Sequence, residues 1–210
     1  MALGHKREGR VLKNILIVYD TVSGSTGEMG EIIRDELRKK LTIESMRVAD
    51  VASIASYDVI IFGSPMRFGG FTSNIKKFIK RHKSELAQKK IIYFFSILYI
   101  VKISEEAMPK PAPYLDPSLA IKTISKKIAT AMDKTHSMGY YDTAITKCAP
   151  EIKPISIAYF KGRLVLSTLP IITRIFMKIV TRLTNKEQEG DFLNPKTVRK
   201  WALELSKVLK

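Results

Sequence analysis

Four hydroxyl side chains lie close together in one short loop near the start of the chain, Thr21-Val22-Ser23-Gly24-Ser25-Thr26. The hydroxyl groups can donate hydrogen bonds, and Gly24 lets the backbone come close to a ligand. A helix that begins near Ser25 would direct its free N–H groups and the positive end of its dipole at the same point. The loop has neither a Walker-type lysine nor the spacing G-x-G-x-x-G. We therefore expect it to bind a phosphate monoester, although a turn that only caps a helix would use the same residue types.

Two further loops contain residues suited to a flat ring. The first of these is G-S-P-M-R-F-G-G at 63–70, whose glycines and proline let the backbone lie against a ring. The side chains of Met66, Arg67 and Phe68 can cover or edge such a ring. The other is S-I-L-Y at 96–99, which can offer backbone amides and an aromatic face. Ligands of open parallel sheets bind beyond the carboxyl ends of the strands, so we expect the three loops to meet there.

Buried strands and amphipathic helices alternate along the chain and position these loops. Continuous β-branched and aromatic runs predict strands, at Asn14–Tyr19, Ile43–Val48, Asp58–Phe62, Ile91–Phe95 and Pro154–Phe160. Apolar residues at helical spacing predict five helices. The first carries Met29, Ile32, Ile33, Leu37 and Leu41, the second Ile75, Phe78, Ile79 and Leu86, and the others span Leu119–Met132, Ile171–Leu183 and Pro195–Leu209, the last capped by Asn194. Strands and helices that alternate with short connections imply right-handed crossovers and a doubly wound parallel sheet.

The composition limits the class of protein. A chain of 210 residues suits one α/β domain, which we place at residues 13–210 after a mobile N-terminus at 1–12. Cys148 is the only cysteine, which excludes a disulfide framework and a multi-cysteine metal or iron–sulfur site and fits a reducing cytoplasm. We find no secretory signal and expect no membrane-spanning segment. The net charge of +16 is compatible with binding a nucleic acid, a membrane surface or an anionic small molecule.

The three loops, in this order after successive strands, resemble those of the flavodoxins. The first loop is similar to the flavodoxin phosphate loop T/S-x-T/S-G-x-T. The resemblance implies an α/β fold with five parallel strands in the order 2-1-3-4-5 and helices on both faces. It also implies FMN as the cofactor, with no catalytic side chain, because the flavin carries the chemistry. It assigns the FMN phosphate to Thr21, Ser23, Gly24, Ser25 and Thr26, with Asp20 pointing away, and the ring to Ser64, Pro65, Met66, Arg67, Phe68 and Gly69 together with Ser96, Ile97 and Leu98.

Within the flavodoxin superfamily, the chain looks most like the menaquinone-dependent protoporphyrinogen dehydrogenases. The similar segments are Y-D-V-I-I-F-G-S-P-M-R-F-G at 57–69, F-F-S at 94–96, A-Y-F-K-G-R-L at 158–164 and I-T-R-I-F-M-K-I-V-T-R-L at 172–183. This resemblance implies an FMN-dependent oxidoreductase with a quinone acceptor or a porphyrinogen substrate. We expect Arg67 to stabilise reduced, anionic flavin, because a fixed positive charge favours that state.

Other interpretations stay open at the level of the sequence. A flavodoxin-type electron carrier would have no small-molecule substrate, although such carriers are usually acidic. A nucleic-acid-binding protein on the same fold would explain the charge, but the basic residues are spread along the chain without an aromatic-plus-basic motif. The helix predicted at 171–183 could lie on an anionic membrane surface or pack on the sheet. The roles of residues 103–118 and 136–153, the electron donor and the formation of a homo-oligomer are not assigned.

Overall fold

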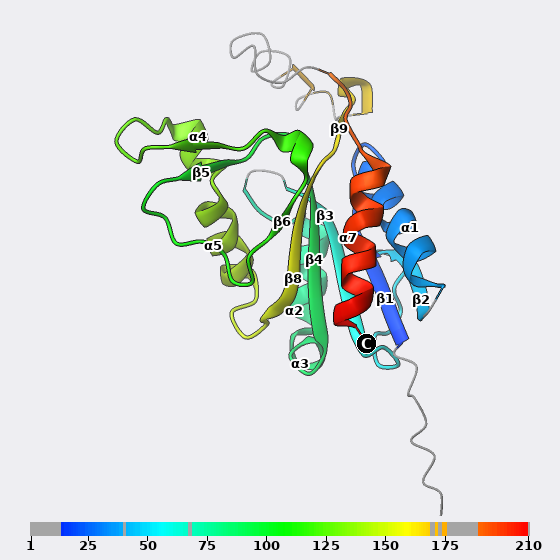
Figure 1. Cartoon of the computed structure of the whole chain (residues 1–210). Helices are drawn as coiled ribbons and strands as arrows, with labels where there is room; N and C mark the ends of the chain where they lie inside the picture. The colour runs from blue at the N-terminus through cyan, green and yellow to red at the C-terminus, as the bar shows by residue number, and fades with distance from the viewer. Residues whose placement is uncertain are drawn as a thin grey trace, which may run out of the picture.

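A six-stranded parallel sheet forms the centre of the molecule (Figure 1). The computed structural model describes residues 14–39, 41–66, 69–168, 171, 174, 175 and 189–209. The strand order is β2-β1-β3-β4-β8-β6, with β1 Asn14–Tyr19, β2 Thr42–Arg47, β3 Val59–Pro65, β4 Lys90–Ile97, β8 Pro154–Lys161 and β6 Tyr114–Leu115. The predicted order 2-1-3-4-5 is confirmed for the five long strands. The short strand β6 adds a sixth strand, which lies beside β8 at the sheet edge.

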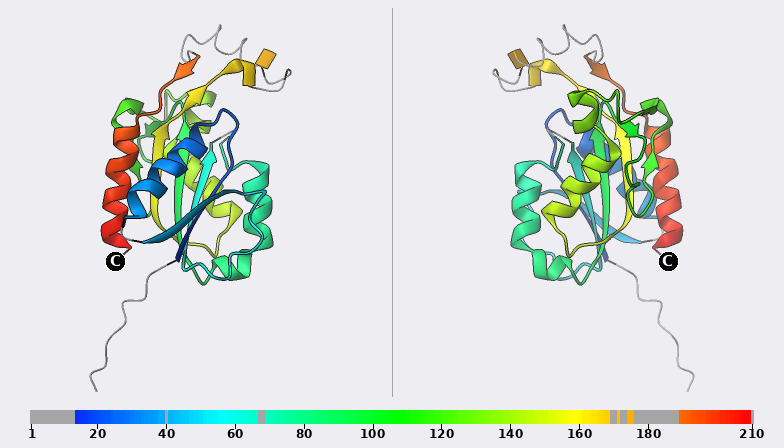
Figure 2. Two further views of the ribbon diagram at one scale, coloured as in Figure 1. Left: turned by 90° about the vertical axis from the view of Figure 1, so that its right-hand side faces the viewer. Right: turned by 90° about the vertical axis from the view of Figure 1, so that its left-hand side faces the viewer.

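Helices cover both faces of the sheet, as the sequence predicts. Helices α1 (Ser25–Leu37) and α7 (Pro195–Val208) pack on one face, while α2 (Ser73–Arg81), α3 (Lys83–Leu86) and α5 (Met138–Cys148) cover the other. Figure 2 shows these two layers on opposite sides of the strands. Successive residues of β3 point to opposite faces, so that Phe62 joins one apolar cluster and Ile61 the other. Both faces of the central strands are therefore buried, which explains their continuous apolar runs.

The C-terminal helix α7 follows its predicted signals closely. The side chain of Asn194 caps it by accepting a hydrogen bond from the backbone N–H of Lys196 at 3.1 Å, and Pro195 occupies the first turn. Trp201 is 2% exposed and lies against Phe94 and Phe160, with ring centroids 6.4 and 5.6 Å away. This helix therefore anchors one face of the sheet through a large aromatic side chain.

The helix predicted at Leu119–Met132 is wrong. The structure has a short 3-10 helix at Pro117–Leu119, strand β7 at Lys122–Ile124 and only then helix α4 at Ala131–Thr135. Strand β7 pairs in parallel with β5 (Val101–Ile103) in a separate two-stranded sheet. The backbone at Ala120 has a φ of +45°, which a continuous helix cannot accommodate. The residues of β7 thus satisfy backbone groups with a partner strand about 20 positions away, which the local pattern does not reveal.

The second predicted helix is also interrupted. Its four apolar positions are all buried, but the helix breaks at His82 into α2 and α3. The ring of His82 lies 4.5 Å from that of Phe78 between centroids, and its Nδ1 atom lies 3.2 Å from a carboxylate oxygen of Glu85. His82 therefore has local structural contacts at the end of α2.

A small antiparallel pair follows the last long strand. Strand β9 (Arg163–Leu164) pairs with β10 (Gly190–Asp191), and a short 3-10 helix spans Leu166–Thr168. Most of the helix predicted at 171–183, and residues 1–12, lie outside the described residues. Among the described residues, no helix is long and apolar enough to cross a membrane.

Candidate functional site

The three loops singled out in the sequence meet at the carboxyl ends of β1, β3 and β4, and residues 63–65 and 96–97 are the last residues of β3 and β4. We call residues 21–26 the first loop, 63–70 the second loop and 96–99 the third loop. The backbone N–H of Met66 donates to the carbonyl oxygen of Ser96 at 3.0 Å, which joins the second loop to the third. The hydroxyl oxygens of Ser25 and Ser96 lie 3.2 Å apart, which joins the first loop to the third. The parallel topology thus brings together residues that are up to 71 positions apart in the sequence.

The first loop leads directly into the N-terminus of α1. Gly24 has a φ of +85°, a conformation that favours glycine, and it has no side chain to cap the helix. The first intrahelical hydrogen bond runs from the N–H of Glu28 to the carbonyl oxygen of Gly24 at 3.1 Å. The three N–H groups before it, of Ser25, Thr26 and Gly27, belong to the end of the helix dipole that attracts anions.

One hydroxyl group in the first loop has no hydrogen-bond partner in the part of the chain that the structure describes. The Oγ1 atom of Thr21 is buried and has no hydrogen-bond partner among the described residues. A buried hydroxyl without a partner costs free energy, so it signals either strain or a ligand that supplies the missing bond. The first loop therefore fits a group with several acceptor oxygens, such as a phosphate.

Asp20, just before the first loop, has its own partners. One carboxylate oxygen accepts a hydrogen bond from the backbone N–H of Thr21 at 3.0 Å, and the other accepts from the side-chain amide of Asn74 at 3.2 Å. Asn74 lies in the first turn of α2. One contact of Asp20 thus runs to α2, and the other holds the first backbone N–H of the first loop.

The second loop is closed by the buried hydroxyl of Ser64, which is fully shielded from solvent. Its oxygen donates to the carbonyl oxygen of Pro65 at 3.0 Å and accepts from the backbone N–H of Thr72 at 3.2 Å. Gly69 has a φ of +75°, and a Cβ atom there would overlap the ring of Tyr140. Arg67 and Phe68, predicted to lie at the ring, fall outside the described residues.

The third loop packs against the chain that follows β8. Ser96 and Ile97 are buried, and Leu98 packs with Val22 and Leu164 in a small apolar cluster. The N–H of Gly162 donates to the carbonyl oxygen of Ile97 at 2.9 Å. A Cβ atom at Gly162 would overlap the hydroxyl of Ser96, so this close approach requires glycine.

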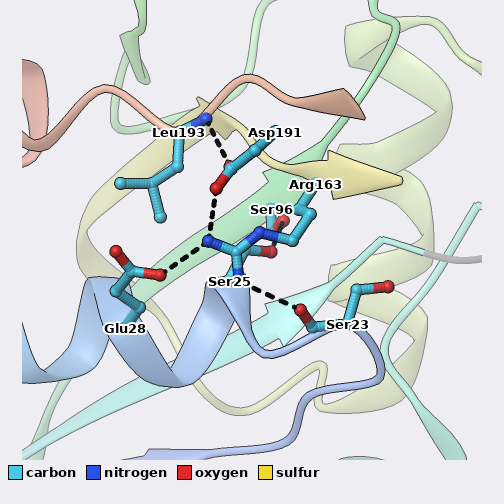
Figure 3. Close-up of polar contacts among 7 residues, drawn as sticks. All are labelled: Ser23, Ser25, Glu28, Ser96, Arg163, Asp191 and Leu193. Atoms are coloured by element: carbon cyan, nitrogen blue, oxygen red, sulfur yellow. Dashed lines mark hydrogen bonds and ion pairs between the residues drawn. The ribbon is translucent and has the colours of Figure 1, made fainter. Parts of the chain in front are cut away.

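Arg163 is a site residue that sequence reasoning missed. Its Nη1 atom donates to the carbonyl oxygen of Ser23 at 3.3 Å, and its Nη2 atom contacts the carboxylates of Glu28, at 2.9 Å, and Asp191 (Figure 3). The guanidinium of Arg163 holds the pKa of Asp191 below its usual value. Its single positive charge offsets half of the negative charge of two carboxylates that would otherwise repel an anion at the first loop. The only sequence signal was its place in the family-like segment at 158–164, because Ser23 and Arg163 lie 140 positions apart.

A doubly wound parallel sheet with three neighbouring loops at its carboxyl edge, the first leading into a helix N-terminus, is typical of flavodoxin-type proteins. The chain belongs to the flavodoxin domain family, whose model matches residues 16–191. Flavodoxin domains bind FMN, and FMN is accordingly the cofactor of this chain.

The individual proteins that resemble this chain share less than 30% of its residues over the matched segments. Protoporphyrinogen IX dehydrogenase [quinone] of Escherichia coli (strain K12) is 28% identical over 107 residues, which cover 47% of this chain and 56% of that protein. NAD(P)H dehydrogenase (quinone) of Archaeoglobus fulgidus is 26% identical over 96 residues, which cover 32% of this chain and 50% of that protein. The matches thus span about half the length of these curated relatives.

Among solved structures, a short-chain flavodoxin associated with a bacterial microcompartment is similar. It aligns with a TM-score of 0.50 at 12% identity, covering 95% of this chain and all of that one (100%). At this level of identity the likeness concerns the fold alone.

Proposed function

We propose that this protein is an FMN-dependent oxidoreductase that binds the FMN phosphate in the first loop and the flavin ring between the second and third loops. The observation that carries the proposal is the buried hydroxyl of Thr21, which has no partner among the described residues. A phosphate oxygen would accept its hydrogen bond and end the cost of leaving it unsatisfied.

The rest of the phosphate site follows from the same loop. The N–H groups at the start of α1 and the hydroxyls of Ser23, Ser25 and Thr26 would supply the remaining donors. Arg163 would hold the first loop in shape through the carbonyl of Ser23 and offset part of the negative charge of Glu28 and Asp191. We expect this partial charge compensation to matter because a phosphate monoester is itself a dianion.

The ring would lie against the backbone of residues 64–69 on one side and 96–98 on the other. Bound FMN would supply the redox chemistry, while these loops orient the ring and exclude water from it. We propose that Arg67 stabilises the reduced, anionic flavin through its positive charge. Replacing Arg67 by alanine should therefore shift the flavin reduction potential to a more negative value; an unchanged potential would exclude this role.

A quinone is the acceptor that we propose. The support is that both curated relatives named above are called quinone-dependent dehydrogenases, one acting on protoporphyrinogen IX and the other on NAD(P)H. The net charge of +16 also favours an anionic partner. Ordinary flavodoxin electron carriers differ, because their own surface is usually acidic. A porphyrinogen is accordingly the first donor to test.

The experiment begins with the visible spectrum of the purified protein and the identification of the chromophore released on denaturation. Flavin bands with released FMN are expected; a colourless protein that fails to take up added FMN would overturn the proposal. The FMN-loaded protein is then photoreduced without oxygen and mixed with menadione, with free FMN at the same concentration as the control. Reoxidation faster than that of free FMN supports a quinone reductase. Reoxidation no faster than free FMN, with rapid transfer to cytochrome c, would instead identify an electron carrier.

A further inference from the structure

A cavity lies between α2 and α5, on the face of the sheet opposite α1 and α7. Its volume is about 650 Å³, which is in the range of sites for small organic molecules. Lysine side chains from three elements line it: Lys76 and Lys80 of α2, Lys83 of α3 and Lys147 of α5. We call this space the lysine cavity. Part of the segment 136–153, whose role the sequence did not reveal, forms α5 and hence one of its walls.

Three of these four cations form no ion pair with any residue that the structure describes. Lys83 forms an ion pair with Glu151 at 2.8 Å. Within the described part of the chain, Lys76, Lys80 and Lys147 have no acidic partner within ion-pair distance. Lys76 and Lys80 are four residues apart on one helix, where like charges repel and destabilise the helix. An anion bound in the lysine cavity would relieve this repulsion and gain the attraction of these three cations.

The inner surface of the lysine cavity is not uniformly polar. Ile79 and Ala149 line it and are 1% and 4% exposed, so they form an apolar floor. The ring of Tyr140, which is 41% exposed, stands at one side. Such a surface suits an organic molecule with a flat apolar body better than it suits a small inorganic anion.

The lysine cavity adjoins the second loop. Gly69 and Gly70 line it, and the ring of Tyr140 lies where a Cβ atom of Gly69 would be. The Nζ atom of Lys76 lies 3.3 Å from the position of a Cβ atom at Gly70. An occupant of the cavity would therefore lie beside the loop that we assign to the flavin ring.

We propose that the lysine cavity binds a flat organic substrate carrying two or more carboxylates, with the carboxylates on the lysines and the apolar body on Ile79 and Tyr140. The statement that the substrate lies beside the flavin rests on the proposed function. The binding of the substrate to the lysine cavity does not depend on it. A dinucleotide fits less well, because only Lys76 lies near the N-terminus of α2, where a phosphate would bind, and the other three lysines lie elsewhere on α2, α3 and α5.

The test uses the FMN-loaded full chain and a fluorescent probe, pyrene-1,3,6,8-tetracarboxylate, with anisotropy as the readout. The Lys80→Glu/Lys147→Glu variant should bind the probe at least about tenfold more weakly than the unmodified protein. The matched control is Lys200→Glu/Lys207→Glu, which makes the same change of net charge on α7 and should bind as the unmodified protein does. Pyrene-1-carboxylate, with the same body and one charge, should bind more weakly than the tetracarboxylate.

Cys148 offers a second readout at the cavity itself. It is the only cysteine in the chain and lines the lysine cavity, so the tetracarboxylate should slow its alkylation by iodoacetamide. Equal affinity of the two double variants, or alkylation of Cys148 unaffected by saturating probe, would overturn the proposal. Tighter binding of NADPH than of the tetracarboxylate would overturn the assigned ligand class. The flavin spectrum of each sample shows separately whether FMN is bound. If the protein binds no FMN but still binds the tetracarboxylate through its lysines, the proposed function is contradicted and the lysine cavity proposal stands.

Discussion

Replacing Thr21 by valine tests whether the hydroxyl of Thr21 binds FMN or stabilises the folded chain. Valine has nearly the shape of threonine but lacks the hydroxyl, which is buried without a partner among the described residues. Without FMN, this hydroxyl only adds a desolvation cost, so its removal should raise the free energy of unfolding by about 1 kcal/mol. With FMN, the variant loses a hydrogen bond to a charged acceptor, worth roughly 1.5–3 kcal/mol. The dissociation constant for FMN should therefore rise roughly 10- to 150-fold.

The two effects have opposite signs, which makes the test sharp. Urea unfolding of the FMN-free protein measures the first, and quenching of FMN fluorescence on binding measures the second. Thr21→Ser, which keeps the hydroxyl, should retain most of the affinity, and Thr42→Val on the exposed edge strand β2 should change neither quantity. A Thr21→Val protein that is less stable by more than about 1 kcal/mol but binds FMN normally would show that the hydroxyl serves the fold.

Three further changes probe the surroundings of the site. In Gly162→Ala the new Cβ atom should clash with the hydroxyl of Ser96 and lower the free energy of unfolding by about 1–3 kcal/mol in urea titrations. Adding Ser96→Gly to the same chain should restore most of this loss. Arg163→Met should weaken FMN binding in titrations by fluorescence. Because Arg163 lowers the pKa of Asp191, its stabilisation is present above the unfolded pKa of about 3.9 and is lost as the pH falls through the lower folded pKa. The difference in unfolding free energy between the unmodified protein and Arg163→Met should therefore shrink as the pH falls below about 4. Trp201→Ala should lower the free energy of unfolding by about 3–5 kcal/mol, because it leaves a cavity between α7 and the sheet. Thermal or urea unfolding measures this loss.

Two of these changes, Gly162→Ala and Trp201→Ala, have a control variant. Gly30→Ala places a Cβ atom at ordinary contact distances of 3.5–3.6 Å inside α1, so it should stabilise the protein. Leu203→Ala, at a residue of α7 that is 47% exposed, should have a small effect on stability. If Gly162→Ala lowers the free energy of unfolding equally in the unmodified chain and in the Ser96→Gly chain, the clash does not involve the hydroxyl of Ser96. A constant difference for Arg163→Met from neutral to acid pH would exclude the Asp191 contact as its source.

The sequence by itself determined the parallel sheet, its five long strands and the last helix. Runs such as Ile15–Val18 and Ile91–Phe95 are buried on both faces, and burial on both faces leaves a continuous apolar pattern that can be recognised locally. The cap formed by Asn194 and Pro195 is likewise a local signal. The three loops could be recognised because parallel topology carries each strand end to the same edge of the sheet.

The tertiary structure alone decided which side chains surround that edge. Arg163 reaches Glu28 across 135 positions and Asp191 across 28, and no periodic pattern encodes such a contact. The pairing of β5 with β7 replaced a predicted helix for the same reason, because a partner strand satisfies the backbone from elsewhere in the chain. The lysine cavity also arises only when α2 and α5 pack on the same face of the sheet. Local sequence determines hydrogen bonds and burial within an element, whereas contacts between elements depend on packing that the whole chain decides.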